Sequence, residues 1–154
     1  MNKKVLVIAV ALMAVAMLAS SIGAVLARPF YMDISIEKAA RMVLSNGHPD
    51  LVVIDLRPSF MFASAHVPGA VNVPVIELTG GTPPVILHWD VLDAWIESEG
   101  QSNLNDKIII HCLAGLVSPT GAQNLIDVGF KKVYSMDGGY NAWVAAGYPT
   151  TPPV

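Results

Sequence analysis

Apolar and polar positions divide the chain into two unlike parts. From Val5 to Ala27 the residues are almost uniformly apolar. Beyond them, short apolar runs alternate with segments in which apolar residues recur every three or four positions. Short apolar runs favour buried strands, and the longer period favours helices with one buried face. The second part of the chain therefore predicts strands separated by helices.

The expected order of elements is regular, and glycines mark several helix ends. We expect helices over 35–46, 58–64, 89–99, 118–128 and 139–146, strands over 51–55, 71–73, 107–111 and 132–134, and a loop over 79–84. Strands that are apolar along their length and separated by helices predict a parallel sheet covered on both faces. The fold class is α/β, with one domain over residues 28–154.

The N-terminal segment, residues 1–27, has the pattern of a signal peptide or a transmembrane anchor. Lys3 and Lys4 precede the apolar stretch, and a helix through residues 5–26 would span about 33 Å, enough for a bilayer core. Its length favours the anchor, although residues 25–27 also fit a cleavage site. Lys3 and Lys4 would stay in the cytoplasm, so the domain is expected to be membrane-anchored or exported, on the extracytoplasmic side.

Composition narrows the classes of function. The 154 residues carry a formal charge of −3 with no basic run in the domain, which argues against nucleic-acid binding. The histidines lack metal-ligand spacing, so we expect no metal. One cysteine permits no internal disulfide. In an exported protein it suggests a reactive thiol or an intermolecular bridge.

That cysteine, Cys112, follows an apolar strand and precedes a helix for which Ser118 is the expected N-cap and Pro119 the first residue. Between them, a short arch turns at Gly115. Backbone N–H groups in such an arch, with a helix behind it, favour negative charge and thiol ionisation. Cys112 is thus a candidate nucleophile, although a free cysteine can also be simply a small buried apolar residue.

Asp55 and Arg57 end another predicted strand, and sites in open parallel sheets form at that edge. An ion pair that fixes the strand end is one interpretation of the two residues. His66 could act as a base, but its His-Val-Pro-Gly setting favours a structural hydrogen bond. His111 should point away from Cys112, because neighbouring side chains on a strand face opposite ways.

Four blocks in order resemble the rhodanese (sulfurtransferase) family, over about residues 34–149. The blocks are Val53-Ile54-Asp55-Leu56-Arg57, Ala65-His66-Val67-Pro68-Gly69-Ala70-Val71-Asn72-Val73-Pro74, the loop that starts at Cys112, and Asp137-Gly138-Gly139-Tyr140-Asn141-Ala142-Trp143 with Ala146-Gly147-Tyr148-Pro149.

The resemblance implies a single rhodanese-like domain whose cysteine carries sulfane sulfur as a persulfide. Cys112 would be the nucleophile. The backbone N–H groups of Leu113, Ala114, Gly115, Leu116 and Val117 would hold the persulfide and donor oxygens. The implied partners are a small donor (persulfide, polysulfide or thiosulfate) and a thiol acceptor, with a protein sulfur partner as a further candidate. No metal or organic cofactor is implied.

The loop departs from the family at Val117, where members that use thiosulfate commonly have a cationic residue before the serine. Valine cannot make charge-assisted hydrogen bonds to an anionic donor. We therefore expect weak thiosulfate turnover and a preference for a less anionic donor. Arg57 is a candidate replacement for the missing positive charge.

Two alternatives remain at this stage. A catalytically silent rhodanese-like binding module is compatible with the change at Val117, although such a module has no need of the thiol. A cysteine phosphatase shares the His111-Cys112-x-x-Gly115 start. Its loop is one residue longer, however, and requires an arginine where this chain has Ser118.

Overall fold

The computed structural model describes residues 30–152, except 46, 82–83 and 101–102. The predicted signal peptide or anchor, residues 1–27, lies outside the described residues. Across the part that is described, no helix combines the length and the apolar character needed to cross a bilayer.

The central sheet is parallel, as the apolar runs predicted, but it has five strands where four were expected. Their order is β1 (Met32–Ile34), β7 (Lys132–Met136), β6 (Lys107–His111), β2 (Leu51–Asp55) and β3 (Ala70–Asn72). The central strand β6 pairs with β2 and with β7, so that Ile109 lies beside both Val53 and Tyr134. All the strands run in one direction, and their carboxyl ends therefore meet at one edge of the sheet.

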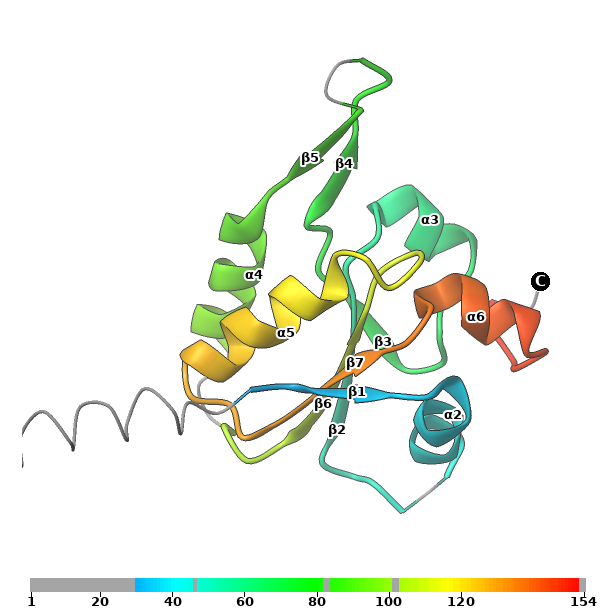
Figure 1. The fold of residues 1–154 in the computed structure, drawn as a ribbon, viewed down its shortest axis with the longest axis vertical. Helices are drawn as coiled ribbons and strands as arrows, with labels where there is room; N and C mark the ends of the chain where they lie inside the picture. The colour runs from blue at the N-terminus through cyan, green and yellow to red at the C-terminus, as the bar shows by residue number, and fades with distance from the viewer. Residues whose placement is uncertain (1–29, 46, 82–83, 101–102, 153–154) are drawn as a thin grey trace, which may run out of the picture.

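Helices cover both faces of this sheet (Figure 1). On one side lie α2 (Ile36–Leu44) and α6 (Gly139–Ala145), and on the other lie α4 (Trp89–Trp95) and α5 (Ser118–Asp127). Along β6, the side chains alternate between two cores. Ile109 packs with Trp143 of α6, whereas Ile108 and Ile110 pack with Leu125 of α5. This alternation explains why the strand is apolar throughout.

Three regions differ from the expected pattern. Strand β1 was not predicted, because three residues at the sheet edge, two of them exposed, give no recognisable period. The predicted loop lies between β4 (Ile76–Leu78) and β5 (Val85–Leu87), which form an antiparallel hairpin that projects from the domain (Figure 1). The helix expected over 89–99 changes after Trp95 into the π-helical turn η1 (Ile96–Gly100).

Candidate active site

The predicted site residues meet at the carboxyl edge of the sheet. Asp55 ends β2 and Cys112 follows β6, the strand beside it. The N–H of Leu56 donates to the carbonyl oxygen of His111 over 2.9 Å and joins the two strand ends just before the loop. A short helix, α3 (Ser59–Ser64), follows Arg57 and forms one side of the site.

Cys112 is buried at the start of the arch that leads into α5. Its residue surface is 2% exposed, and its Sγ accepts a hydrogen bond from the N–H of Val117 over 3.4 Å. Gly115 has a φ of +78°, so the turn uses the left-handed region that glycine adopts without strain. The chain thus curls around the sulfur, while Leu113 and Leu116 face outward, 38% and 85% exposed.

The start of α6 packs directly against this loop. The N–H groups of Tyr140 and Asn141 donate to the carbonyl oxygens of Cys112 and Leu113, each over 2.9 Å. Gly139, with a φ of +58°, makes the approach possible, since a Cβ there would lie 2.5 Å from the Cys112 oxygen. Two loop carbonyls are therefore bonded to α6.

Ser118 is not the N-cap that the sequence predicted. Helix α5 begins at Ser118 itself, and Val117 occupies the cap position without a side-chain cap. The Ser118 hydroxyl is fully buried, 3.9 Å from the sulfur of Cys112, and accepts a hydrogen bond from Ser135 Oγ over 3.2 Å. The hydroxyl faces the thiol because the helix starts one residue earlier than expected.

Asp55 and Arg57 form a buried ion pair. Arg57 Nη2 lies 2.6 Å from Asp55 Oδ2, and Nε is 3.0 Å from both carboxylate oxygens. Nη2 also donates to the carbonyl oxygen of Ala65 over 2.8 Å. The guanidinium stacks 3.6 Å from the centre of the Tyr140 ring. The carboxylate and the ring together hold the cation against the wall of the site.

The two histidines near the site have different surroundings. His66 Nδ1 lies 2.8 Å from the carbonyl oxygen of Phe62, and its ring stacks on the Phe62 ring, in keeping with a structural role. His111 is fully buried, and its Nδ1 lies 3.2 Å from the carbonyl oxygen of Cys112. Burial lowers the pKa of His111 below 6.5, and the nearby Asp55 charge opposes this only in part.

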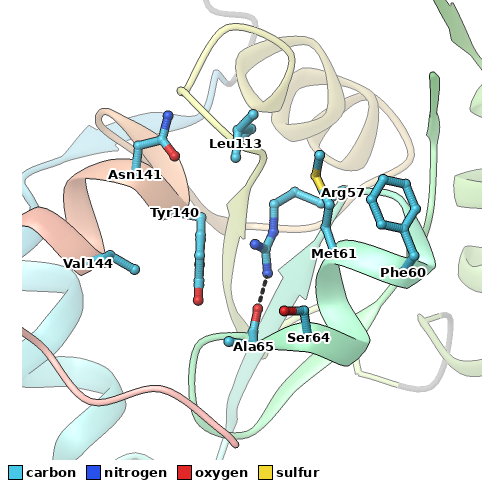
Figure 2. Close-up of a pocket in the computed structure, with 9 residues that line it drawn as sticks. All are labelled: Arg57, Phe60, Met61, Ser64, Ala65, Leu113, Tyr140, Asn141 and Val144. Atoms are coloured by element: carbon cyan, nitrogen blue, oxygen red, sulfur yellow. Dashed lines mark hydrogen bonds between the residues drawn. The ribbon is translucent and has the colours of Figure 1, made fainter. Parts of the chain in front are cut away.

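An open cavity of about 360 Å³ lies between α3, the loop and α6 (Figure 2). Figure 2 shows the Arg57 guanidinium beside the Tyr140 ring, with Leu113 above them. Cys112 itself does not line this cavity, whereas the next residue, Leu113, does. The described residues contain no group of three or more His, Cys, Asp or Glu side chains arranged to hold a metal.

Three residues at the site have no role predicted from the sequence. Gly139 and Tyr140 stand in the fourth family block without an assigned role. Ser135 lay beyond the end of the predicted strand. Two features of the sequence could have indicated these residues. One is the Gly138-Gly139 pair before a helix, and the other is a serine within an otherwise apolar run, Val133 to Met136.

The chain is similar to known proteins in sequence and in fold. The rhodanese-like domain family matches residues 36–146. A thiosulfate sulfurtransferase GlpE from Pseudoalteromonas translucida is 31% identical over 97 residues, which are 63% of this chain and 76% of that protein. The chloroplastic thiosulfate sulfurtransferase 16 of Arabidopsis thaliana is 34% identical over 97 residues, 63% of this chain and 77% of that protein.

A solved structure from Rhodopseudomonas palustris, of a protein of unknown function described as a possible tyrosine phosphatase, has a TM-score of 0.60 and 22% identity. The likeness covers 77% of this chain and 83% of that one, and at this identity it shows the fold alone. The family match covers most of the chain and includes the strand ends, the cysteine loop and the start of α6. The chain belongs to the rhodanese-like domain family.

Proposed function

We propose that this protein is a sulfurtransferase that carries sulfane sulfur as a persulfide on Cys112. The main support for the proposal is the loop that follows Cys112. It curls back on this residue, and the N–H of Val117 donates to the Cys112 sulfur over 3.4 Å. The names of the relatives, thiosulfate sulfurtransferases, support the same reaction class.

The reaction proceeds in two balanced halves. The thiolate of Cys112 attacks the outer sulfur of the donor, a new S–S bond forms, and the donor's own bond to that sulfur breaks, with the electron pair leaving on the donor. The thiolate of an acceptor then attacks the outer persulfide sulfur, and Cys112 is released as a thiolate. Backbone N–H groups of residues 113–117 stabilise the charge that moves onto the outer sulfur.

Thiosulfate is a weak donor in this proposal. Val117 offers its N–H group to the sulfur of Cys112 but no positive side chain to the donor. Arg57 is the candidate substitute, and its partners limit that role, because Asp55 and the Ala65 carbonyl already bind Nε and Nη2. A donor whose negative charge is smaller, an organic persulfide, or spread over a longer chain, a polysulfide, fits these surroundings better.

Intact-mass analysis of the purified full chain tests the proposal. Wild type and Cys112→Ser are each exposed to thiosulfate and, separately, to polysulfide. We expect wild type alone to gain one sulfur atom, faster from polysulfide, and to lose it to an added thiol. No gain from either donor would contradict the enzyme proposal and favour the binding-module alternative.

We also propose that residues 5–26 anchor the protein to a membrane, with the domain on the extracytoplasmic side. The apolar length of this segment and the preceding Lys3 and Lys4 support the proposal. Membranes from cells that express the full chain are washed with carbonate and the fractions are blotted. The anchor predicts retention in the membrane pellet, whereas release into the supernatant would contradict it.

A further inference from the structure

The cavity beside the cysteine loop is mainly apolar where it opens to solvent. Phe60 of α3 is 64% exposed and Val144 of α6 is 45% exposed, and Leu113 of the loop lies at the same cavity. The N–H of Asn141 donates to the carbonyl oxygen of Leu113 over 2.9 Å and holds the α6 wall against the loop. The apolar surface is therefore continuous with the residue that follows the nucleophile.

The cavity offers almost no free positive charge. Among the described residues that line it, Arg57 is the one with a charged side chain. That charge is balanced by Asp55, which binds Nη2 over 2.6 Å and Nε over 3.0 Å. A small dianion such as thiosulfate would lose its water here without gaining an unpaired cation, which is unfavourable.

The size of the cavity also favours an organic ligand over a small inorganic anion. At about 360 Å³ this open cavity is large enough to hold a small organic group, and a few polar groups lie among its apolar side chains. The polar groups in the lining include Ser64 and Asn141. The apolar surface comes from Phe60, Met61 and Val144. Such a lining suits a molecule with one polar head and a hydrocarbon body.

From these observations we propose that the cavity binds the organic substituent of the sulfur donor, so that the preferred donors carry their sulfane sulfur on an apolar body. The inference rests on the proposed sulfurtransferase function and names its substrate class. For an organic thiosulfonate, R–SO₂–S⁻, the Cys112 thiolate attacks the outer sulfur, the new S–S bond forms, and the sulfinate R–SO₂⁻ leaves with the electron pair of the broken bond.

Two thiosulfonates test the proposal, because methanethiosulfonate and benzenethiosulfonate share their charge and transferred sulfur and differ in apolar body. The rate of sulfur gain on the full chain is measured by intact mass and divided by the rate with N-acetylcysteine, which corrects for intrinsic reactivity. We expect the corrected rate to be about tenfold higher for the benzene compound, a factor that corresponds to about 1.4 kcal/mol.

Two matched variants test whether the preference for benzenethiosulfonate arises in the cavity. Val144→Asn places an amide in the apolar wall and should remove most of the preference. Leu44→Asn makes a similar change near the end of another helix, α2, at a residue that is also 45% exposed, and should leave the preference intact. Equal corrected rates for the two donors, or the same preference in Val144→Asn, would overturn the proposal.

Binding without reaction separates this inference from the proposed function. In full-length Cys112→Ser, benzenesulfonate and methanesulfonate are titrated and followed by calorimetry. Tighter binding of benzenesulfonate, weakened by Val144→Asn, supports the cavity's role even if no donor loads sulfur onto wild type. Equal binding of both sulfonates overturns it, whatever the loading experiment shows.

Discussion

Val117 contacts the thiol through its main chain, while its half-buried side chain packs against the core. Its N–H, not its side chain, reaches the sulfur of Cys112. Val117→Arg should therefore keep that hydrogen bond and add a cation for the donor. We expect kcat/KM for thiosulfate to rise by about ten- to a hundredfold, measured by sulfite release.

The control for Val117→Arg is Leu116→Arg. It adds the same charge one residue earlier, where the side chain is 85% exposed and faces solvent. Leu116→Arg should raise thiosulfate turnover far less. Equal effects from the two variants would mean that general electrostatic attraction, rather than a contact at position 117, determines the use of thiosulfate.

Ser135 is the second residue whose effect can be measured. Its hydroxyl donates to Ser118 Oγ over 3.2 Å, and Ser118 Oγ in turn lies 3.9 Å from the sulfur of Cys112. Ser135→Ala removes one buried hydrogen bond, and we expect sulfur loading to slow about fivefold, the equivalent of about 1 kcal/mol.

Ser135→Thr keeps the hydroxyl and should restore most of the loading rate, which a purely structural effect of side-chain volume would not do. Time courses of intact mass for the three proteins at one pH provide the measurement. A Ser135→Ala variant that loads sulfur at the wild-type rate would show that the Ser135 hydroxyl has no influence on the thiol.

At the scale of elements, the cysteine loop and α6 behave as one unit. The contact depends on Gly139, whose φ is +58° and whose position leaves no room for a Cβ, 2.5 Å from the Cys112 carbonyl oxygen. Gly139→Ala should lower the free energy of unfolding by more than about 2 kcal/mol, because strain and steric overlap add. Urea denaturation measures the change.

Gly81→Ala is the comparison for that substitution. Gly81 lies between β4 and β5 without a positive φ, and a Cβ there would be 3.7 Å from its nearest neighbour. It should be nearly neutral. If Gly139→Ala is equally mild, the loop and α6 can separate at little cost, and their coupling is weaker than the contacts indicate.

Periodicity predicted the elements that carry the core but not those at its margins. Strands such as β6 and helices such as α5 pack on both sides or along a full face, and their sequences show it. Strand β1 and the β4–β5 hairpin are three residues long per strand and largely exposed, so burial leaves no period in them.

The sequence predicted at which edge of the sheet the candidate site lies, but not all of the hydrogen bonds within it. The strand ends placed Asp55, Arg57 and Cys112 correctly, since parallel strands share an edge. The one-residue shift at Ser118 was not predictable from the local sequence, because Val117 and Ser118 can both precede Pro119 at a helix start. In the structure the Ser118 hydroxyl is bonded to the buried Ser135 hydroxyl and does not cap the helix. Such choices depend on tertiary contacts that a local pattern does not contain.

For the whole molecule, His111 makes stability depend on pH. Burial lowers its pKa in the folded protein below the 6.5 of an exposed histidine. As pH falls below about 6.5, the unfolded chain binds a proton at His111 before the folded protein does, and unfolding becomes easier. This contribution to stability is fully present above pH 6.5 and is lost progressively below it, down to the folded-state pKa.

Urea denaturation at several values between pH 7.5 and 5 measures this dependence. Wild type should lose stability steadily below about pH 6.5, and His111→Gln, which cannot be protonated, should show a smaller slope after its overall loss of stability is subtracted. Identical slopes in the two proteins would assign the pH dependence to other groups.

The hydrogen bonds from Tyr140 and Asn141 to the loop carbonyls hold the loop in place through main-chain atoms, which leaves its outward side chains free to vary. Main-chain groups and glycines fix the path of the loop, while Leu113 and Leu116 point outward and Val117 binds the sulfur through its N–H. Main-chain atoms thus determine the path of the loop and the contact with the thiol, whereas outward side chains determine what a donor meets. Substitution of Leu113, which lines the cavity, can therefore alter donor preference while the fold is left intact, so a new specificity is accessible by a single step.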